Sequence, residues 1–330
     1  MTGQSPPIIP TDFGASSEVQ LVAHNSDANY GQIVKEVYLR HLIDGTIKQN
    51  ESQRIVTGVS IVDLSSDRTL VGHNEDVEQF AASINKLPVS LLLLEDLRTH
   101  KVKMSQKVTW TADDIRGGYG NFDQPTAPLE APLRDLVYDM LHRSGNTALR
   151  VIVNNVLGGP QAVNDRWSEK PELSHTRLDV LDPTHFYLGN TTPHDSLWTM
   201  RELMKRQDTY AAYMKNAMSD NIFTDFGVRS QYTGDTGIRL INKIGLLDDP
   251  TGNNRHDVGI IYSPKEHKSY AYSFMTTAPY DENNTDPTVQ ADQSLKDMGR
   301  SLLQFAGSKR AQKQPIGTNL QLRVDGRIHY

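Results

Sequence analysis

The spacing of apolar residues divides the chain into segments expected to be helices and segments expected to be strands. Between residues 28 and 48, apolar side chains recur three and four positions apart, which is typical of an amphipathic helix. The segments Thr57–Leu64 and Thr69–Gly72 are strand-like, and the polar residues Ser65–Arg68 between them form a turn signal. The chain is therefore expected to begin with a helix and a hairpin.

The middle of the chain has a helical pattern. It runs from residue 83 to about 230, is clearest at Leu133–Arg143 and Thr147–Leu157, and includes a polar loop expected at Trp167–Pro193. Strand-like segments then return, separated by turns rich in Gly, Asp, Asn and Pro, and a closing helix follows. The strands are expected at Arg239–Ile244, Val258–Tyr262 and Ser269–Thr276, and the helix at Ser294–Phe305.

Strands near both ends of a chain, with helices between them, predict one sheet assembled from distant segments and an inserted all-α lobe. We expect residues 26–82 and 233–307 to form the α/β lobe that contains the sheet, and residues 83–232 to form the helical lobe. Residues 1–25 are expected to be an N-terminal arm, and residues 308–330 a polar C-terminal tail. A functional site should lie at the seam between the lobes.

Composition narrows the classes of function. The 330 residues are 37% hydrophobic with a net charge of -6, which is ordinary for a globular protein and argues against nucleic-acid binding. The longest fully apolar run, Leu91–Leu94, is far shorter than the roughly 20 residues of a membrane span. The absence of cysteine excludes disulfides, thiolate metal sites and a cysteine nucleophile. The first residues show no signal-peptide pattern.

The stretch 82–94, ASINKLPVSLLLL, places Ser83 and Lys86 on one helix face at the start of an apolar run, where the lysine is expected to be desolvated. Alone, S-x-x-K occurs about once by chance in such a chain, most often as a helix cap followed by a surface lysine. Two more triplets follow in order, Ser144-Gly145-Asn146 and Lys243-Ile244-Gly245. Ser144 as a helix N-cap and Lys243 as a solvated strand residue are the alternatives. The order of the three motifs is what departs from chance.

This motif set resembles that of the penicillin-recognising serine enzymes, most closely the class A β-lactamases, whose motifs are S-x-x-K, S-D-N and K-T-G. The resemblance extends to G-G-P at 158–160, to TRLDVLDP at 176–183 beside the family's TRLDRWEP, and to T-T-P at 191–193. It covers about residues 30–306. It implies an α+β fold, with a five-stranded antiparallel sheet flanked by N- and C-terminal helices and an inserted helical lobe.

The resemblance implies a role for each motif residue. Ser83 would be the nucleophile, Lys86 its base, and Ser144 the relay that carries a proton to the leaving nitrogen. The backbone N–H groups of Ser83 and Leu246 would form the oxyanion hole. Substrate binding would fall to Asn146, which holds a side-chain amide, to Lys243 beside Gly245, which anchors a carboxylate, and to Arg255 or His256 on the following strand.

The positions at which this sequence differs from the family's motifs matter most for the release of the acyl group from the serine. Asp182 takes the position of the family's omega-loop glutamate, which activates the hydrolytic water, and it is one methylene shorter. A helix-capping or turn aspartate is the alternative. Phe186 and Val180 replace the family's asparagine and arginine in this loop, which is also shorter, and Ile244 and Gly145 replace the second residues of K-T-G and S-D-N.

Three hypotheses remain open. The protein hydrolyses β-lactams with Asp182 as the base; or it is a peptidoglycan D-alanyl-D-alanine peptidase, which needs no omega-loop carboxylate; or it is a sensor or binding module that stays acylated. The expected partner is a small β-lactam or a peptidoglycan stem peptide, with no nucleic acid and no membrane span, and a monomer is expected. No cofactor or metal is expected, since the 11 histidines show no H-E-x-x-H spacing. The resemblance implies a secreted or periplasmic location.

Overall fold

The computed structural model describes residues 30–232, 237–249, 252–281 and 283–307, together with the backbone of a short antiparallel pair, β11 (Gln321–Leu322) and β12 (Ile328–His329). The predicted arm, residues 1–25, lies outside the described residues, as does the predicted tail apart from that pair. Among the helices of the described segments, none combines the length and apolarity that a membrane crossing needs.

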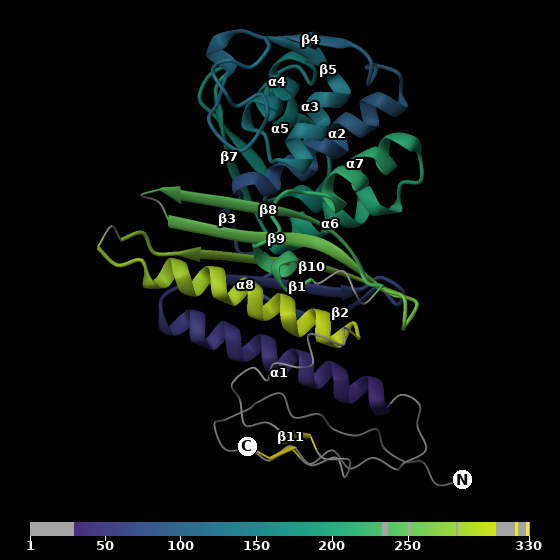
Figure 1. Ribbon diagram of the computed structural model, residues 1–330, viewed down its shortest axis with the longest axis vertical. Coiled ribbons are helices and arrows are strands. Elements are labelled where there is room, and N and C mark those ends of the chain that lie inside the picture. Colours follow the sequence, from purple (N-terminus) through teal and green to yellow (C-terminus); the bar gives the residue numbers. More distant parts are fainter. Residues whose placement is uncertain are drawn as a thin grey trace.

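A five-stranded antiparallel sheet lies at the centre of the molecule (Figure 1). Its strand order is β2-β1-β10-β9-β8, so the first two strands of the chain pair with the last three. The strands are β1 (Val56–Asp63), β2 (Arg68–His73), β8 (Arg239–Asp249), β9 (Gly252–Ser263) and β10 (Lys268–Ala278). The predicted fold class, with a sheet built from distant segments, is confirmed.

Two helices cover one face of this sheet (Figure 1): α1 (Tyr30–Ser52) and α8 (Asp286–Phe305). Apolar residues of both helices and of the sheet form one buried cluster, including Leu39, Ile43, Tyr272, Phe274 and Leu302. Helix α8 begins eight residues before the predicted Ser294, because its first turns are polar and lack the apolar stripe on which the prediction depended.

The helical lobe packs on the other face and surrounds α2 (Lys86–Arg98). All four leucines of 91–94 are buried, as expected for a helix that is apolar all round. Between α2 and the sheet lies α6 (Pro193–Lys205), which begins where Thr192 accepts a hydrogen bond from Asp195 N and Pro193 takes the first helical position. The other helices are α3 (Leu133–His142), α4 (Asn146–Asn155), α5 (Pro160–Ser168) and α7 (Thr209–Ser219), with short 3-10 turns η1 (Ala82–Asn85), η2 (Ala112–Asp114), η3 (Pro171–Leu173) and η4 (Gly227–Gln231).

The prediction that this lobe is all-α is wrong. The segment expected to be a polar loop contains a hairpin of β6 (Arg177–Val180) and β7 (Phe186–Thr191), which β3 (Gln79–Phe80) extends to three strands. A second small sheet pairs β4 (Lys107–Thr109) with β5 (Glu130–Pro132). The hairpin was missed because Asp179, Gly189 and Asn190 are residue types that strands usually lack.

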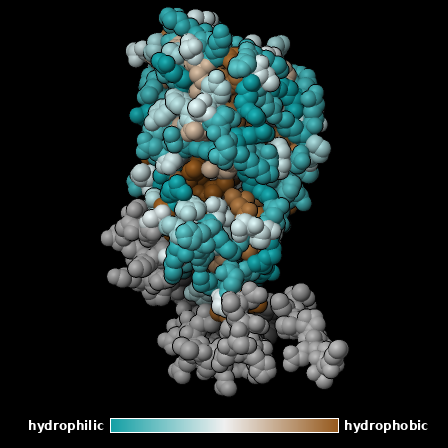
Figure 2. Space-filling model, turned by 90° about the vertical axis from the view of Figure 1, so that its right-hand side faces the viewer, coloured by the Kyte–Doolittle hydropathy of each residue, from teal (hydrophilic) through white to brown (hydrophobic). Residues whose placement is uncertain are grey.

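Hydrophilic residues dominate the face of the molecule drawn in space-filling form, and apolar residues gather there in one hollow at mid-height (Figure 2). The described surface therefore shows little exposed apolar area on this side. The large apolar side chains of the chain are mostly in the two buried clusters on either side of the sheet.

Candidate active site

Ser83 lies in the 3-10 turn η1, immediately before α2, and lines a cavity of about 1130 Å³. The preceding residue, Ala82, has a φ of +44°, a left-handed conformation that costs energy for any residue with a side chain. Backbone strain of this kind is concentrated at functional sites, where the surrounding packing holds it in place. The turn thus holds the Ser83 hydroxyl at the cavity wall.

Lys86 brings the motif residues together. Its side chain is 0% exposed, and its Nζ donates to Ser83 Oγ at 2.9 Å, to the Ser144 carbonyl at 2.6 Å and to Asn146 Oδ1 at 2.8 Å. Burial lowers the pKa of Lys86 to about 7, although the carboxylates of Asp123 and Asp139 act in the opposite direction. Near neutral pH, a fraction of this amine is therefore uncharged and able to accept a proton.

Ser144 lies between two buried lysines. The Nζ of Lys243 donates to Ser144 Oγ at 2.8 Å and to the Ile244 carbonyl at 2.8 Å, while Lys86 Nζ lies 3.2 Å from the same hydroxyl. Lys243 is 1% exposed, and burial together with the charge of Lys86 holds its pKa well below the usual value. The alternative of Lys243 as a solvated strand residue is therefore wrong.

A carboxylate from another helix occupies the space beside Gly145, the middle residue of the S-x-N triplet. A Cβ on Gly145 would lie 2.1 Å from Oδ2 of Asp139, which comes from α3. Asp139 Oδ1 accepts from Asn121 N, and Asp123 accepts from the N–H groups of Asn146 and Thr147. An aspartate at this position would therefore collide with the Asp139 carboxylate.

Close packing against η1 explains the glycine of K-x-G. A Cβ on Gly245 would lie 3.0 Å from Ile84 Cγ1 and 3.2 Å from the Ala81 carbonyl, so edge strand β8 passes directly beside the Ser83 turn. Leu246, the next residue, lines the same cavity as Ser83. Both expected oxyanion donors thus belong to one cavity.

The structure does not bring Arg255 into this cavity. Its side chain extends to the opposite face of the sheet, where it binds Asp248 and donates to Asp292 Oδ1 of α8 at 2.8 Å. His256 is on the same face as Gly245, its register partner, but it is fully buried with Nε2 2.8 Å from the Phe80 carbonyl. Neither lines the cavity, because side chains alternate along β9 and the one on the correct face is covered.

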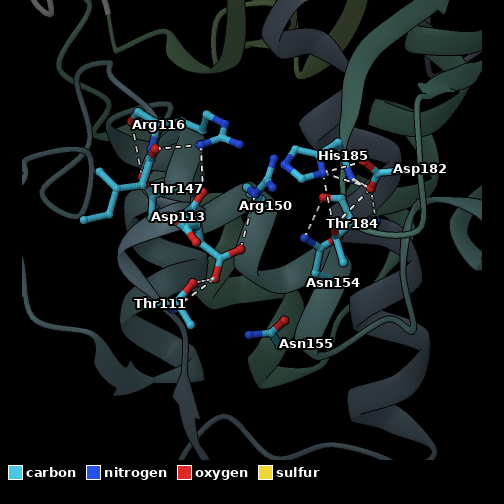
Figure 3. A network of polar contacts seen from close by, with 12 residues as sticks. Thr111, Asp113, Arg116, Thr147, Arg150, Asn154, Asn155, Asp182, Thr184 and His185 are labelled. Carbon is cyan, nitrogen blue, oxygen red and sulfur yellow. Dashed lines mark hydrogen bonds and ion pairs between the residues drawn. The ribbon is translucent and has the colours of Figure 1, made fainter.

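Asp182 does not line the cavity that contains Ser83, and lies beside Thr184 and His185 (Figure 3). Asp182 lies at the tip of the β6–β7 hairpin, where its Oδ1 accepts from the N–H groups of Thr184 and His185, each at 2.8 Å. Its side chain is 48% exposed, and the hydrogen bonds with Thr184 and His185 hold its pKa well below the usual range. This is the geometry of the turn-aspartate alternative.

Asn85 ties the base of this hairpin to the nucleophile turn. Its Nδ2 lies within hydrogen-bond distance of the carbonyls of Arg177, Leu188 and Asn190. Glu78 adds an ion pair to Arg177 at 2.9 Å. The exposed residues 181–185 between the two strands lie beyond these anchors, and Asn154 Nδ2 of α4 donates to the Thr184 carbonyl at 3.0 Å.

Several cavity residues were not foreseen. Tyr119 and Phe223 pack edge to face at 5.4 Å, and Phe186 and Tyr187 belong to the hairpin wall. The polar lining beyond the motifs comprises Glu78, Gln79, Arg116, Arg150, Asp179, Asn190, Asn254 and Thr277. Of these only Arg150 carried a usable signal, since it follows Asn146 by four positions on the same helix. Within the described residues, no group of three His, Asp or Glu side chains could hold a metal ion.

Comparison with known proteins agrees with this arrangement. Residues 39–305 match the beta-lactamase enzyme family. The β-lactamase of Bacillus licheniformis is 25% identical over 254 residues, which cover 73% of this chain and 78% of that protein. "Beta-lactamase 3" of Bacillus cereus is 24% identical, with coverage of 71% and 73%.

Solved structures share the fold. A β-lactamase from Sphaerobacter thermophilus has a TM-score of 0.67 at 22% identity, covering 81% of this chain and 97% of that one. A single-residue variant of PBP-A, solved as an acyl-enzyme complex with penicillin G, has a TM-score of 0.66 at 18% identity, with the same coverage. Because the family match extends over most of its length, this chain belongs to the beta-lactamase enzyme family.

Proposed function

We propose that this protein is an active-site serine hydrolase that forms an acyl-enzyme on Ser83 with β-lactams and releases it slowly. The observation that carries the proposal is the position of Lys86 Nζ, which is buried and lies 2.9 Å from Ser83 Oγ. A serine hydroxyl needs a base within hydrogen-bond reach, and a lysine with a pKa of about 7 supplies one.

Acylation proceeds in two proton transfers. Lys86 takes the proton of Ser83 Oγ as this oxygen bonds to the lactam carbon, and the N–H groups of Ser83 and Leu246 stabilise the oxyanion, each by about 3 kcal/mol. The lactam C–N bond then breaks, and Ser144 passes a proton to the leaving nitrogen. Because Ser144 lies between Lys86 and Lys243, its hydroxyl can be re-protonated from either amine.

Asn146 and Lys243 contribute to substrate binding in different ways. Asn146 Nδ2 donates to the Gly117 carbonyl at 2.8 Å, which leaves its second N–H for the carbonyl of a substrate side-chain amide. Lys243 is buried and does not itself line the cavity, so we expect it to act on a substrate carboxylate through Ser144, which accepts its hydrogen bond at 2.8 Å and lines the cavity. Arg255 and His256 take no part.

Slow release follows from the position of the carboxylates. Asp182 is at an exposed turn outside the cavity, so it is not the deacylation base. Glu78 and Asp179 are the carboxylates in the wall, and Arg177 lies 2.9 Å and 4.0 Å from them. Because both carboxylates interact with Arg177, neither is well placed as a base to activate a water for attack on the acyl ester.

A peptidoglycan D-alanyl-D-alanine peptidase is the second candidate, and the position of Asp182 outside the cavity favours it over a fast β-lactamase. Peptide substrates leave a less hindered ester, and that reaction needs only Ser83, Lys86, Ser144 and Lys243. Either activity is expected outside the cytoplasm, where peptidoglycan is assembled. Family membership supports this location.

The test follows the protein by intact mass and absorbance together. After mixing with penicillin G, we expect a persistent adduct of one penicillin, mapped by peptide analysis to Ser83, and only slow hydrolysis of a chromogenic cephalosporin. Rapid turnover without an adduct would contradict slow release, and no adduct with no turnover would reject the acylation itself. Release of D-alanine from a stem pentapeptide would identify the peptidase.

A further inference from the structure

The Ser83 cavity continues beyond the S-x-N motif along α4. Asn146, Leu149 and Arg150 all line it, and their spacing of three and four positions places them on one face of the helix. Arg150 also lines a neighbouring cavity of about 440 Å³. A substrate side chain that extends past the amide held by Asn146 therefore meets Arg150 next.

Arg150 has unused hydrogen-bonding capacity. Its side chain is only 7% exposed, and its one polar partner among the described residues is Asp114, whose Oδ1 accepts from Nε at 3.3 Å. A guanidinium has five N–H donors, so its terminal groups stay available. The other oxygen of Asp114 is occupied by Thr111 N and Thr111 Oγ1.

Arg116 lies in the same wall and has neutral partners. Its Nη1 donates to the carbonyls of Asp113 and Ile115, and no carboxylate within the described segments forms an ion pair with it. Burial and the charge of Arg150 lower the pKa of Arg116, so two like charges lie close together, although Asp113 and Asp114 offset part of this effect. Asp113 itself is exposed to water.

The acidic groups of the cavity belong to a different wall. Glu78 and Asp179 lie on the side of the β6–β7 hairpin, where Arg177 forms an ion pair with Glu78 at 2.9 Å and lies 4.0 Å from Asp179. Figure 3 shows Arg150 between Arg116 and His185. The Nε of Arg150 donates to Asp114 Oδ1. An anion entering this end would therefore meet guanidinium N–H groups and no unpaired buried carboxylate.

We propose that Arg116 and Arg150 form a subsite for a carboxylate carried by the acyl side chain of the substrate, beyond the amide that Asn146 holds. The inference rests on the proposed acylation of Ser83 and specifies its substrate class. The occupant is an acidic acylamino group, whether it belongs to a β-lactam or to a stem peptide. A guanidinium forms charge-assisted, frequently bidentate hydrogen bonds with a carboxylate. The two arginines are therefore the strongest hydrogen-bond donors available to a carboxylate here.

Three penicillins that differ only at one position test the charge preference. Penicillin G has an uncharged phenylacetyl side chain, and its α-carboxy and α-amino analogues add one negative or one positive group. We expect the second-order rate constant for acylation to be at least about ten-fold higher for the α-carboxy compound, the factor that one charge-assisted hydrogen bond supplies. This ratio should fall as salt is raised from low ionic strength. Equal rates, or a preference for the α-amino compound, would overturn the proposal.

Variants assign the preference to the two arginines. Arg116→Gln and Arg150→Gln should each reduce the carboxylate-to-neutral ratio toward one. Arg134→Gln, at an exposed position beside Asp135, makes the same change on α3 and should leave the ratio unchanged. Arg150 is buried, so thermal unfolding is measured in parallel, and Arg116→Gln decides the question if Arg150→Gln fails to fold. A ratio preserved in Arg116→Gln would overturn the subsite.

Peptides distinguish the natural source of the carboxylate. Stem peptides ending in D-alanyl-D-alanine are compared with their acidic side-chain group free or amidated. Faster D-alanine release from the free acid supports the subsite with a peptide occupant, and faster release from the amide would overturn it. Failure of all three penicillins to acylate Ser83 would reject the proposed function, whereas acylation without charge preference rejects only the subsite.

Discussion

The motif cluster and the β6–β7 hairpin differ in how they hold their polar groups. Lys86, Ser144 and Lys243 are buried, and each contacts a group from another element, so packing of the whole core fixes their positions. Asp182 is half exposed, and its hydrogen bonds go to residues two and three positions along the same turn. The proposed nucleophile and base are thus held by the packing of the core, whereas the Asp182 carboxylate stabilises its own turn.

Replacing Ser83 by Ala tests the core half of this comparison and has the largest expected effect. Covalent labelling by a fluorescent penicillin should be abolished, because the other hydroxyl near Lys86 Nζ, that of Ser144 at 3.2 Å, is also bound by Lys243 and is not beside the proposed oxyanion donors. Ser90→Ala is the matched control: its hydroxyl donates to the Lys86 carbonyl within α2, away from the cavity. Label on another residue would reject Ser83 as nucleophile.

Restoring the family's aspartate should damage the core. In Gly145→Asp the new Cβ would lie 2.1 Å from Asp139 Oδ2, so overpacking alone is expected to cost about 1–3 kcal/mol of stability, beyond the repulsion of a third carboxylate. Labelling should slow by about 100-fold, since small displacements of a catalytic loop are expensive. Chemical denaturation and labelling kinetics measure both effects.

Two further variants isolate the cause. Gly45→Asp makes the same change on α1, where a Cβ meets nothing within 4 Å, and should leave labelling unchanged. The double variant Gly145→Asp with Asp139→Ala should regain part of the lost stability. No recovery in the double variant would show that Asp139 is not the conflicting group.

The pH dependence of acylation follows from Lys86. With a pKa of about 7, its free-base fraction falls about ten-fold per pH unit below neutrality, so the labelling rate should fall likewise between pH 7 and pH 5 and level off above pH 8. A rate independent of pH in this window would contradict Lys86 as the base.

Stability must be followed in parallel, because buried groups act in opposite directions over this window. Burial lowers the pKa of His256 to about 4, so its contribution to stability decreases as pH falls, whereas two carboxylates act the other way. Burial raises the pKa values of Asp139 and Asp257 to about 6, so over this window the folded state binds protons more readily than the unfolded state at these groups. Their contribution to stability therefore increases as pH falls from 7 to 5. Thermal unfolding at each pH measures the balance.

The smallest effect concerns the hairpin. Asp182→Asn keeps the turn acceptor and should change the release rate of the penicilloyl adduct by less than about two-fold, as is usual at exposed sites. Asp179→Asn is the matched change in the same hairpin, at the carboxylate that does line the cavity, and should slow any residual release more. A large loss in Asp182→Asn alone would mean that the hairpin moves toward Ser83 and would invalidate the comparison.

The sequence predicted the catalytic motif cluster better than its surroundings. Ser83, Lys86, Ser144, Asn146 and Lys243 come together as expected, because each motif lies at the end or edge of an element whose apolar pattern was clear. The middle of β9 was missed. Its Arg255, His256 and Asp257 are polar yet buried, and each is satisfied by partners from distant elements that no local pattern reveals.

The prediction that Asp182 lies in the active site failed for a related reason. Its alignment with a catalytic residue depended on a match in residue types, but D-P-T-H also encodes a tight turn, and the local hydrogen bonds determine its geometry. Gly145 could not be explained from its own triplet, since the conflicting Asp139 lies on a different helix.

The attachment of the hairpin by Asn85 makes its tip a place where the chain can change length. The three carbonyls bound by this amide belong to β6 and β7, so residues added at the exposed positions 181–183 would leave these anchors to the Ser83 turn, and the bond from Asn154 to the Thr184 carbonyl, in place. Insertions at such exposed turns cost little in loop-closure entropy, about 0.6 kcal/mol for each doubling of loop length. Length changes at this turn would therefore alter the rim of the hairpin and leave the arrangement of Ser83 and Lys86 unchanged.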